Sequence, residues 1–305
     1  MSKHECKHPA GLAAALGIGA GLIAWKKLSN RRVAFNNEGD GDDATASQTA
    51  VITGASSGLG ESFAKRLASD GYDLVLIARR REKLETIAQA LQTAHGINVT
   101  IATADLIDKN DVDQLADQLA AMDNIAILIN NAGFGSRGDF VDVPAQSHRD
   151  MINLHVAATA VLTRAVLPKM IAQGRGAIIS VSSTASFFRG HDRVNYGATK
   201  LYLNAFSESL QIELEGTGVR VQTLCPGFIR SGFHEELGRP SLPNFLWMET
   251  DEVADISLNA LNTKSVIIVP GWANQAQVFL TKIGLGGALL GVFYALSGKK
   301  VISNK

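Results

Sequence analysis

Short, continuously apolar segments alternate with longer amphipathic segments along most of the chain. Apolar runs lie at residues 50–53, 73–77, 99–103, 125–130, 177–181, 219–224 and 266–269. Strands that are apolar on both faces are typical of parallel sheets, because helices cover such sheets on both sides. Helical patterns lie between the runs, at residues 59–69, 80–95, 111–122, 147–172 and 196–215. The repeated β-α order therefore predicts an α/β fold, a doubly wound parallel sheet of about seven strands with right-handed crossovers.

The N-terminal end of the chain differs from this pattern. Residues 9–25 carry no charged side chain, and four basic residues follow within residues 26–32. A membrane-spanning helix needs about 20 apolar residues, with about 17 as the lower limit. We interpret residues 1–35 as an apolar segment that anchors the chain in a membrane, with the catalytic domain on the cytoplasmic side. The alternatives are a cleaved signal peptide or a loosely ordered leader; without an anchor we expect a cytoplasmic protein.

Two further boundaries follow from composition. Residues 36–48 are polar and acidic and bury nothing, which is typical of a flexible linker. A catalytic domain is then expected at residues 49–272, and an apolar C-terminal tail at residues 273–305. The uncharged run at 283–297 within this tail is short for a membrane span, so we interpret it as a packed or interfacial helix.

Charge and cysteine usage exclude some classes of function. The 305 residues include 29 basic and 29 acidic side chains, and this balance argues against nucleic acid as the main partner. Cys6 and Cys225 lie far apart, so the sequence supports neither a disulfide framework nor a zinc site. His148, His155 and His191 have no paired ligand spacing, and we assign no metal.

A glycine-rich turn joins the first apolar run to the first helix. Its sequence, TGASSGLG at residues 53–60, places glycines in the pattern G-x-x-x-G-x-G. In a dinucleotide-binding fold, such glycines permit a tight turn, a close approach of the backbone to the pyrophosphate and close helix–strand packing. Free N–H groups at the start of the helix then face the phosphates. The turn is expected to contribute Gly54, Ser56, Ser57, Gly58, Leu59 and Gly60 to a cofactor site.

Arginines follow the second apolar run and bear on the choice of cofactor. NAD-binding folds usually place an acidic residue at this strand end, whereas an arginine accommodates the 2′-phosphate of NADP. Residues 79–81 are all arginine, with no carboxylate at the strand end, and we expect Arg79 to bind the phosphate. The alternative is that these arginines only solvate a helix start. The pattern favours NADP(H).

Four motifs together resemble the short-chain dehydrogenase/reductase family, in its compact single-domain form with a Rossmann-type sheet. They are the glycine turn at 53–60, the sequence NNAG at 130–133, Ser183, and the sequence YGATK at 196–200. They occur in the family's order and spacing, and the resemblance covers residues 49–271. It implies a nicotinamide-dependent oxidoreductase that acts on a carbonyl or alcohol. The helix that holds Tyr196 commonly forms a subunit interface in similar proteins, which implies a homo-oligomer.

The resemblance implies a role for each matching position. Tyr196 is expected to be the general acid/base, and Lys200 to lower its pKa and hold the nicotinamide ribose. Ser183, thirteen residues before Tyr196, is expected to bind the substrate oxygen. Asn153 is expected to support a proton-relay water near Lys200, and Asp105 to contact the adenine.

Other matching positions are expected to line the cofactor. Pro226 and Gly227 follow the sixth apolar run, where the family flanks the nicotinamide. Ser231 stands where the family usually has threonine; its hydroxyl could still reach the carboxamide, but the departure weakens that assignment. The adenosine pocket is expected to be lined by Asn131, Ala132 and Gly133.

The chemistry of the catalytic set can also be argued from the residues themselves. Tyr196 and Lys200 are four residues apart, so both project from one face of a helix. A tyrosine has an ordinary pKa of about 10, and a nearby ammonium favours the phenolate. In reduction, hydride adds to the carbonyl carbon while the phenol protonates the oxygen, and the Ser183 hydroxyl donates to the same oxygen. Ser182 competes with Ser183 for this role, and only the spacing to Tyr196 favours Ser183.

These observations predict an NADP(H)-dependent reductase of an apolar or lipid-like carbonyl or alcohol substrate. The apolar ends of the chain and Phe245, Trp247 and Met248 suggest such a substrate, although core packing of these three side chains is an equal alternative. A second hypothesis is a regulatory or scaffold protein that binds NADP(H) without turnover, but the complete catalytic set argues against it. A third hypothesis is an isomerase or epimerase that acts on a sugar nucleotide. Such enzymes typically carry a longer C-terminal substrate domain, which is not seen in this sequence.

Overall fold

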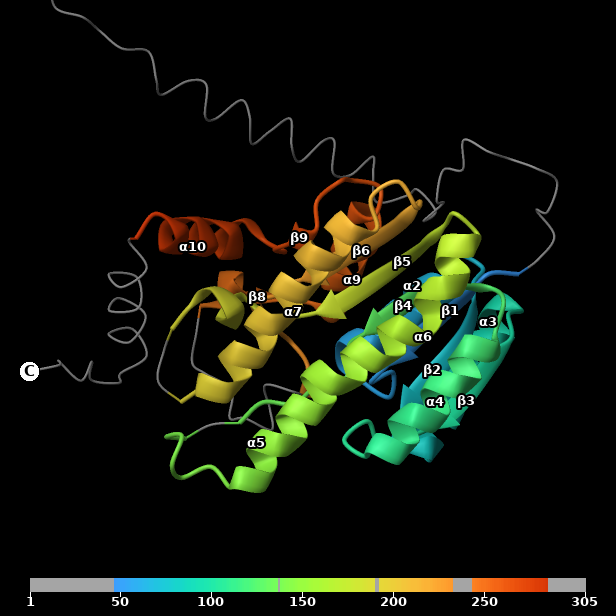
Figure 1. Cartoon of the computed structure of the whole chain (residues 1–305), viewed down its shortest axis with the longest axis horizontal. Helices are drawn as coiled ribbons and strands as arrows, with labels where there is room; N and C mark the ends of the chain where they lie inside the picture. The colour runs from blue at the N-terminus through green and yellow to red at the C-terminus, as the bar shows by residue number, and fades with distance from the viewer. Residues whose placement is uncertain (1–46, 137, 190–191, 233–242, 285–305) are drawn as a thin grey trace, which may run out of the picture.

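The computed structural model of this chain describes residues 47–136, 138–189, 192–232 and 243–284. Within them, seven parallel strands form one sheet in the order β3-β2-β1-β4-β5-β6-β9 (Figure 1). All seven lie on the apolar runs of the sequence, which confirms the doubly wound α/β fold. The strands are β1 (Thr49–Thr53), β2 (Asp73–Ala78), β3 (Val99–Thr103), β4 (Ile125–Asn130), β5 (Gly176–Val181), β6 (Val219–Leu224) and β9 (Ile267–Ile268).

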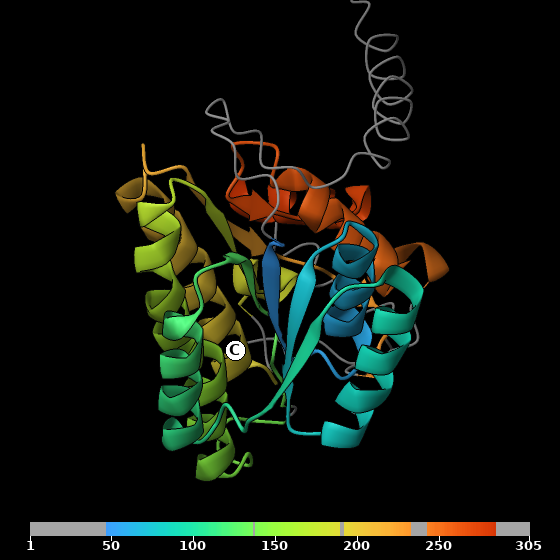
Figure 2. The ribbon, with the colours of Figure 1, turned by 90° about the vertical axis from the view of Figure 1, so that its right-hand side faces the viewer.

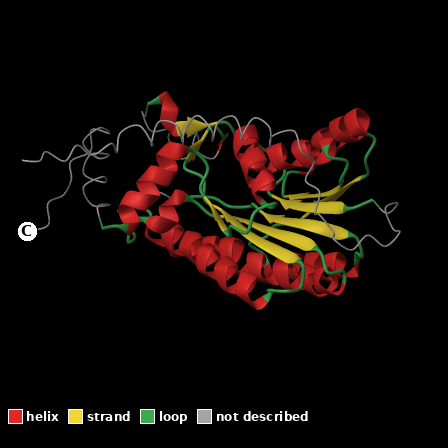
Figure 3. Cartoon of the chain, turned by 90° about the horizontal axis from the view of Figure 1, so that it is seen from above, coloured by secondary structure: helices red, strands yellow, loops and turns green. Residues whose placement is uncertain are grey.

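Helices cover both faces of the sheet, as continuous apolar strands require (Figures 2 and 3). One hydrophobic core lies between the sheet and α2 (Gly58–Ser69), α3 (Arg81–His95) and α9 (Thr250–Ala260). A second core lies on the opposite face, beneath α4 (Lys109–Ala121), α6 (Ala158–Ala172) and α7 (Val194–Glu213). The central strands β1, β4 and β5 are buried along their whole length.

Smaller elements lie beyond the carboxyl end of the sheet and complete the described part of the chain. The strands β7 (Phe228–Ile229) and β8 (Trp247–Met248) pair with each other. The helix α10 (Trp272–Lys282) packs against the 3₁₀ helix η2 (Thr184–Phe187). The remaining helices are α5 (Ala145–Ile152), the π-helix η1 (Asn153–Ala157), η2 (Thr184–Phe187), the 3₁₀ helix η3 (Asn244–Leu246) and α10 (Trp272–Lys282).

The elements α5, η1 and α6 join into one long helix, Ala145–Ala172, in which an 18-residue stretch has a mean hydropathy of 1.3. Among the residues that the structure describes, it is the one helix whose length and composition would suit a membrane span. However, α6 packs against α4 and β4, and Leu162, Val166 and Met170 are buried in the core beneath it. The apolar side chains of this helix therefore pack in the interior of the domain. The anchor and linker predicted at residues 1–48 lie almost wholly outside the described residues, as does the tail beyond residue 284, and they stay predictions.

The strand order reverses next to β1, which has β2 on one side and β4 on the other. The chain leaves β1 toward α2 on one face of the sheet and leaves β4 toward α5 and α6 on the other face. In open α/β sheets, ligands bind beyond the carboxyl ends of the strands at such a reversal. The fold therefore places the candidate site at the ends of β1 and β4.

The turn between β1 and α2 depends on glycine at two positions. Gly54 has a φ of 67°, a left-handed conformation that side chains with a Cβ rarely adopt. Gly60 lies in the first turn of α2, where an added Cβ would meet the Gly54 carbonyl oxygen and lie 2.7 Å from Asn131 Nδ2. Close packing between the helix and the turn therefore requires the absence of a side chain at residue 60.

We expect Gly60→Ala to destabilise the domain by about 1–3 kcal/mol, the usual cost of forcing extra atoms into a packed region. Denaturant unfolding of the purified protein measures this loss. Gly232→Ala is the matched control, because a Cβ at Gly232 meets nothing within 4 Å. Equal midpoints for the two variants would show that the turn accommodates a side chain.

Candidate active site

A hydroxyl group holds together the two strand ends at which the sheet order reverses. Thr53 Oγ1, at the end of β1, donates to the Ile129 carbonyl and accepts the N–H groups of Asn131 and Ala132, at 2.9 and 3.0 Å. The Asn131 side chain returns a hydrogen bond to the Thr53 carbonyl at 2.9 Å. The glycine turn and the NNAG segment, far apart in sequence, are therefore fixed side by side.

The arginines after β2 occupy different environments. Arg80 Nη2 donates to the hydroxyls of Ser56 and Ser57 in the glycine turn, at 2.8 Å in each case. Arg79 is 69% exposed and forms a loose ion pair with Asp105, with 3.9 Å between the charged atoms. The guanidinium that contacts the glycine turn is therefore that of Arg80, and the contact expected between Arg79 and a 2′-phosphate stays a prediction. Asp105, expected near the adenine, lies at the same edge, beside Arg79.

Several groups around the glycine turn suit a dinucleotide. Ser57 precedes α2 in an extended conformation, and its side chain makes no capping hydrogen bond to the helix. The Ser231 hydroxyl is buried and has no hydrogen-bond partner among the described residues. A Cβ on Gly58 would lie 3.3 Å from Ser231 Cβ, so this orphaned hydroxyl lies against the turn. Such a group calls for a ligand partner, because a buried polar atom without one is costly.

The ends of β5 and β6 are joined on the other side of the reversal. The Pro226 carbonyl, just after β6, accepts the Thr184 N–H at the start of η2 at 2.9 Å. Gly227 packs against the Asn274 side chain of α10, which would collide with a Cβ at that position. These contacts place Pro226 and Gly227 beside the segment that carries Ser183.

The first turns of α7 carry a tyrosine and a lysine in a dry environment. Lys200 is 4% exposed, its Nζ donates to the Val181 carbonyl at 2.8 Å, and burial lowers the pKa of this amine from 10.5 to about 7. Lys200 Nζ lies 5.7 Å from the centroid of the Tyr196 ring. Burial raises the pKa of the Tyr196 phenol above its ordinary value, and a hydrogen bond with Ser183 only partly offsets the rise. The expectation of a lowered phenol pKa is therefore wrong for this structure, because desolvation outweighs the favourable contacts.

The two adjacent serines at the end of β5 have different partners. Ser182 is buried, and its hydroxyl donates to the Lys200 carbonyl at 2.8 Å. Ser183 caps η2 by accepting the Ala185 N–H at 3.1 Å and also bonds with Tyr196. The structure thus brings together Ser183, Tyr196 and Lys200, as predicted, and gives Ser182 a role in packing.

The Asn153 side chain does not point into this cluster, and the expected support of a proton-relay water near Lys200 stays a prediction. Asn153 is exposed, and its amide donates to the Ile107 carbonyl at 3.4 Å. Residues two apart on a helix point to nearly opposite sides, so Asn153 and His155 cannot both face the strand ends. His155 faces them: it is 1% exposed, and its ring makes an edge contact with the Tyr196 ring, with centroids 5.9 Å apart. The apolar residues around position 155 were a signal that it points inward.

Of the three large side chains considered for a substrate wall, two belong to the core. Trp247 and Met248 are buried in β8, and Met248 is part of the core beneath α9. Phe245 is 64% exposed and stacks on Trp272 of α10, which is 73% exposed, with ring centroids 6.3 Å apart. Phe245 and Trp272 therefore form an exposed aromatic pair beside the elements that hold Ser183.

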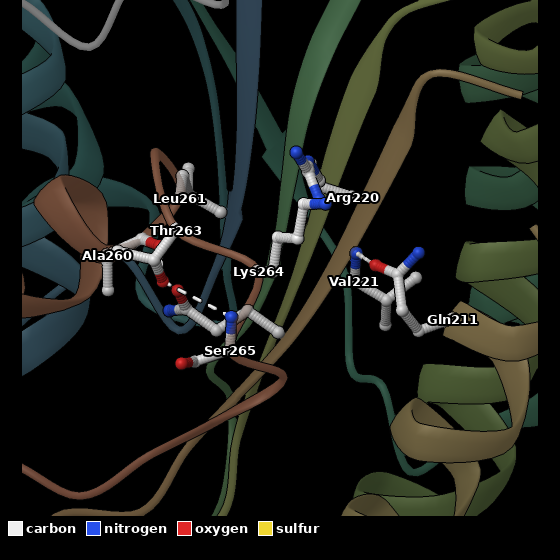
Figure 4. A pocket seen from close by; sticks show the side chains of 9 residues that line it. Gln211, Arg220, Val221, Ala260, Leu261, Thr263, Lys264 and Ser265 are labelled. Carbon is white, nitrogen blue, oxygen red and sulfur yellow. Dashed lines mark hydrogen bonds between the residues drawn. The ribbon is translucent and has the colours of Figure 1, made fainter. Parts of the chain in front are cut away.

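Figure 4 shows the side chains that line a depression elsewhere in the domain. It is lined by Arg220, Val221 and Lys264 together with other mainly polar side chains. Arg220 and Val221 lie at the beginning of β6, so this depression is at the opposite end of the sheet from the reversal. None of the residues that line it is a tyrosine or a glycine, and we assign it no catalytic role.

Comparison with known proteins agrees with this geometry. The family model for short chain dehydrogenases matches residues 48–241. A short chain dehydrogenase of Pseudocercospora fijiensis is 37% identical over 196 residues, which cover 63% of this chain and 62% of that protein. Very-long-chain 3-oxoacyl-CoA reductase-A of Danio rerio is 29% identical over 211 residues, 68% of this chain and 66% of that protein. The chain thus spans less than two thirds of the length of either relative.

A solved structure shares nearly the whole described fold. The short-chain dehydrogenase from Sphingobium yanoikuyae in complex with NADPH is 32% identical, with a TM-score of 0.72 over 85% of this chain and 98% of that one. The family model spans every strand from β1 to β7, and the structural likeness extends over the sheet on both sides of its reversal. On this evidence, the chain belongs to the short-chain dehydrogenase family of oxidoreductases.

Proposed function

We propose that this protein is an NADP(H)-dependent reductase that converts an apolar, lipid-like ketone to an alcohol, with Tyr196 as the proton donor. The observation that carries the proposal is the cluster of Ser183, Tyr196 and Lys200 beside the glycine turn. A protein that only bound the nucleotide would have no use for a buried amine, because burial of an amine costs stability. The cluster therefore favours an enzyme over a scaffold.

The choice of NADP(H) rests on the groups at the end of β2. Arg80, held between the Ser56 and Ser57 hydroxyls, offers donors where a 2′-phosphate would lie, and Arg79 adds a second positive charge at this edge. No carboxylate ends β2 to accept a ribose hydroxyl. The similar protein from Sphingobium yanoikuyae was solved in complex with NADPH. The glycine turn, Asn131 and Ser231 would hold the rest of the dinucleotide.

A protonated phenol is the form that the proposed reduction requires. When bound, the cofactor supplies a hydride to the carbonyl carbon. Because burial raises the pKa of Tyr196, the phenol keeps its proton near neutral pH and can donate it to the substrate oxygen. The Ser183 hydroxyl donates a hydrogen bond to the same oxygen and stabilises its developing negative charge. Lys200, one helical turn from Tyr196, would bind the ribose next to the nicotinamide.

An apolar substrate is favoured by the surface around Ser183. Phe245 and Trp272 present aromatic faces to solvent beside η2. Contiguous apolar surface of this kind marks binding sites, whereas single exposed apolar residues are ordinary. The Danio rerio relative is named as a reductase of very-long-chain 3-oxoacyl-CoA. We therefore place the substrate among ketones with long apolar chains.

Tyr196→Phe removes only the phenolic oxygen, and we expect kcat to fall by about 10²–10⁴-fold because general-acid catalysis is lost. Loss of NADPH absorbance with a panel of long-chain ketones measures turnover. NADPH binding, followed by fluorescence titration, should stay within a few-fold of wild type and serves as the control for folding. Turnover by the variant at the wild-type rate would contradict the proposed chemistry.

Arg80→Gln should weaken catalysis with NADPH but not with NADH, because only NADPH carries the 2′-phosphate. Charge-assisted hydrogen bonds are worth about 1.5–3 kcal/mol, so kcat/KM for NADPH should fall roughly 10–100-fold. Arg79→Gln is the matched control and should change the ratio of the kcat/KM values for NADPH and NADH less. A larger loss of kcat/KM for NADPH in Arg79→Gln would mean that Arg79, and not Arg80, contacts the 2′-phosphate.

Lys200→Met tests the cost of the buried amine through the pH dependence of stability. Between pH 7 and 10.5, the unfolded lysine holds a proton that the folded one has released, because its folded pKa is about 7. Wild-type stability should therefore rise with pH relative to the variant, by up to about 1.4 kcal/mol per pH unit. Urea unfolding of both proteins at pH 7, 8 and 9 measures this difference. A difference that stayed constant across these pH values would mean that Lys200 is charged in the folded protein.

A further inference from the structure

His155 is a buried titratable group beside Tyr196 that the proposed mechanism does not use. His155 lies in the π-helix η1, between α5 and α6, where the Ala158 N–H reaches back five residues to the Asn153 carbonyl. Such wide turns within helices occur frequently at functional sites. The imidazole is 1% exposed and lies between the loop after β4 and the first turn of α7.

Hydrogen bonds determine the tautomer of this imidazole. Thr199 Oγ1 lies 3.0 Å from His155 Nδ1 and donates its own hydrogen to the Tyr196 carbonyl at 2.9 Å. The threonine oxygen must therefore accept from Nδ1. His155 Nε2 accepts the backbone N–H of Phe134 at 3.2 Å. The ring is thus neutral, with its hydrogen on Nδ1, and both nitrogens are engaged.

The charged surroundings agree with a neutral ring. Burial, reinforced by the positive charge of Lys200, holds the pKa of His155 well below its usual 6.5. An added Cβ on Gly133 would lie 2.9 Å from His155 Nε2 and 3.5 Å from Lys200 Nζ, so imidazole and amine meet at the same glycine. Protonation of the ring would both break the Phe134 bond and place two positive charges side by side.

We propose that His155 is a positioning residue for Tyr196, which ties the first turn of α7 to the loop after β4 and seats the phenol ring against its edge. The tie runs from Phe134 N–H through both ring nitrogens to Thr199, and from there to the Tyr196 carbonyl. The ring edge contact, at an interplanar angle of 76°, fixes the phenol from the side. With both nitrogens engaged, the imidazole carries no proton to or from the phenol. This inference rests on the proposed function of Tyr196.

Substitutions of His155 by Asn and by Gln distinguish the hydrogen bond with Thr199 from the hydrogen bond with Phe134. In His155→Asn, the amide nitrogen lies near the place of Nδ1 and can donate to Thr199, whereas in His155→Gln the longer side chain reaches the place of Nε2 instead. Because the Thr199 bond holds the Tyr196 turn, we expect His155→Asn to keep kcat within about 5-fold of wild type. His155→Gln and His155→Ala should lose about 10–100-fold in kcat, since a displacement of about 1 Å can cost about 10²-fold.

Thr199→Val breaks the same tie without touching the imidazole. It should reproduce the loss in kcat seen in His155→Ala, and the double variant should be no worse than either single variant, because both remove one connection. The KM for the ketone should change little in all of them, since substrate contacts are retained. Additive losses of kcat in the double variant would contradict the proposed connection through His155 and Thr199. So would a His155→Asn variant as impaired as His155→Ala.

A measurement on the protein alone tests the tautomer. In protein labelled with ¹⁵N-histidine, two-bond ¹H–¹⁵N correlations distinguish a hydrogen on Nδ1 from one on Nε2, and the signals absent from His155→Asn identify residue 155. We expect a neutral ring with its hydrogen on Nδ1 at pH 7.5. A hydrogen on Nε2, or a doubly protonated ring, would overturn the proposal. This readout does not depend on turnover, and His155→Asn and Thr199→Val keep the test valid if His155→Ala fails to fold.

Tyr196→Phe separates failure of this inference from failure of the proposed function. If Tyr196→Phe is inactive while His155→Ala and Thr199→Val turn over at the wild-type rate, the positioning role alone is wrong. If Tyr196→Phe turns over normally, the proposed function is wrong, and the NMR result still decides the state of His155.

Discussion

The site depends on a single hydroxyl at the point where two neighbouring strands part. After β1 the chain turns to one face of the sheet, and after β4 it turns to the other, so nothing in the ladder itself holds the two strand ends together beyond this point. Thr53 Oγ1 joins them by one donated and two accepted hydrogen bonds, which uses the full capacity of a hydroxyl group. The glycine turn on one side and the loop that leads to Phe134 on the other are positioned by this contact.

Much of the fold could be predicted from the sequence, because buried parallel strands leave a local signal. Each of the seven apolar runs became a strand, and the glycine turn followed the first of them, where the backbone requires a residue without a side chain at Gly54. The grouping of Ser183, Tyr196 and Lys200 was also predictable, since helical spacing and strand ends place them together. These features depend on residues close in sequence or on the general geometry of the fold.

The features that were missed depend on side-chain direction and on solvation, which a motif does not encode. Arg79 and Arg80 are adjacent, and only the exit path of the chain from β2 decides that Arg80 faces the turn. Asn153 carried the more suggestive side chain, yet His155 occupies the inward position. The phenol pKa was expected to fall because an amine lies nearby, but the depth of burial that raises it is a property of the assembled domain.

The π-helix between α5 and α6 affects how this sequence aligns with those of its relatives. One extra residue in a turn rotates everything that follows by about 100° around the helix axis, as helical geometry requires. A relative whose helix lacks the wide turn would need a one-residue gap inside a continuous helix to keep equivalent side chains in register. An alignment that forbids such a gap would pair His155 with a residue of the relative that lies on the outer surface of the helix. The role of His155 would then be assigned to that residue.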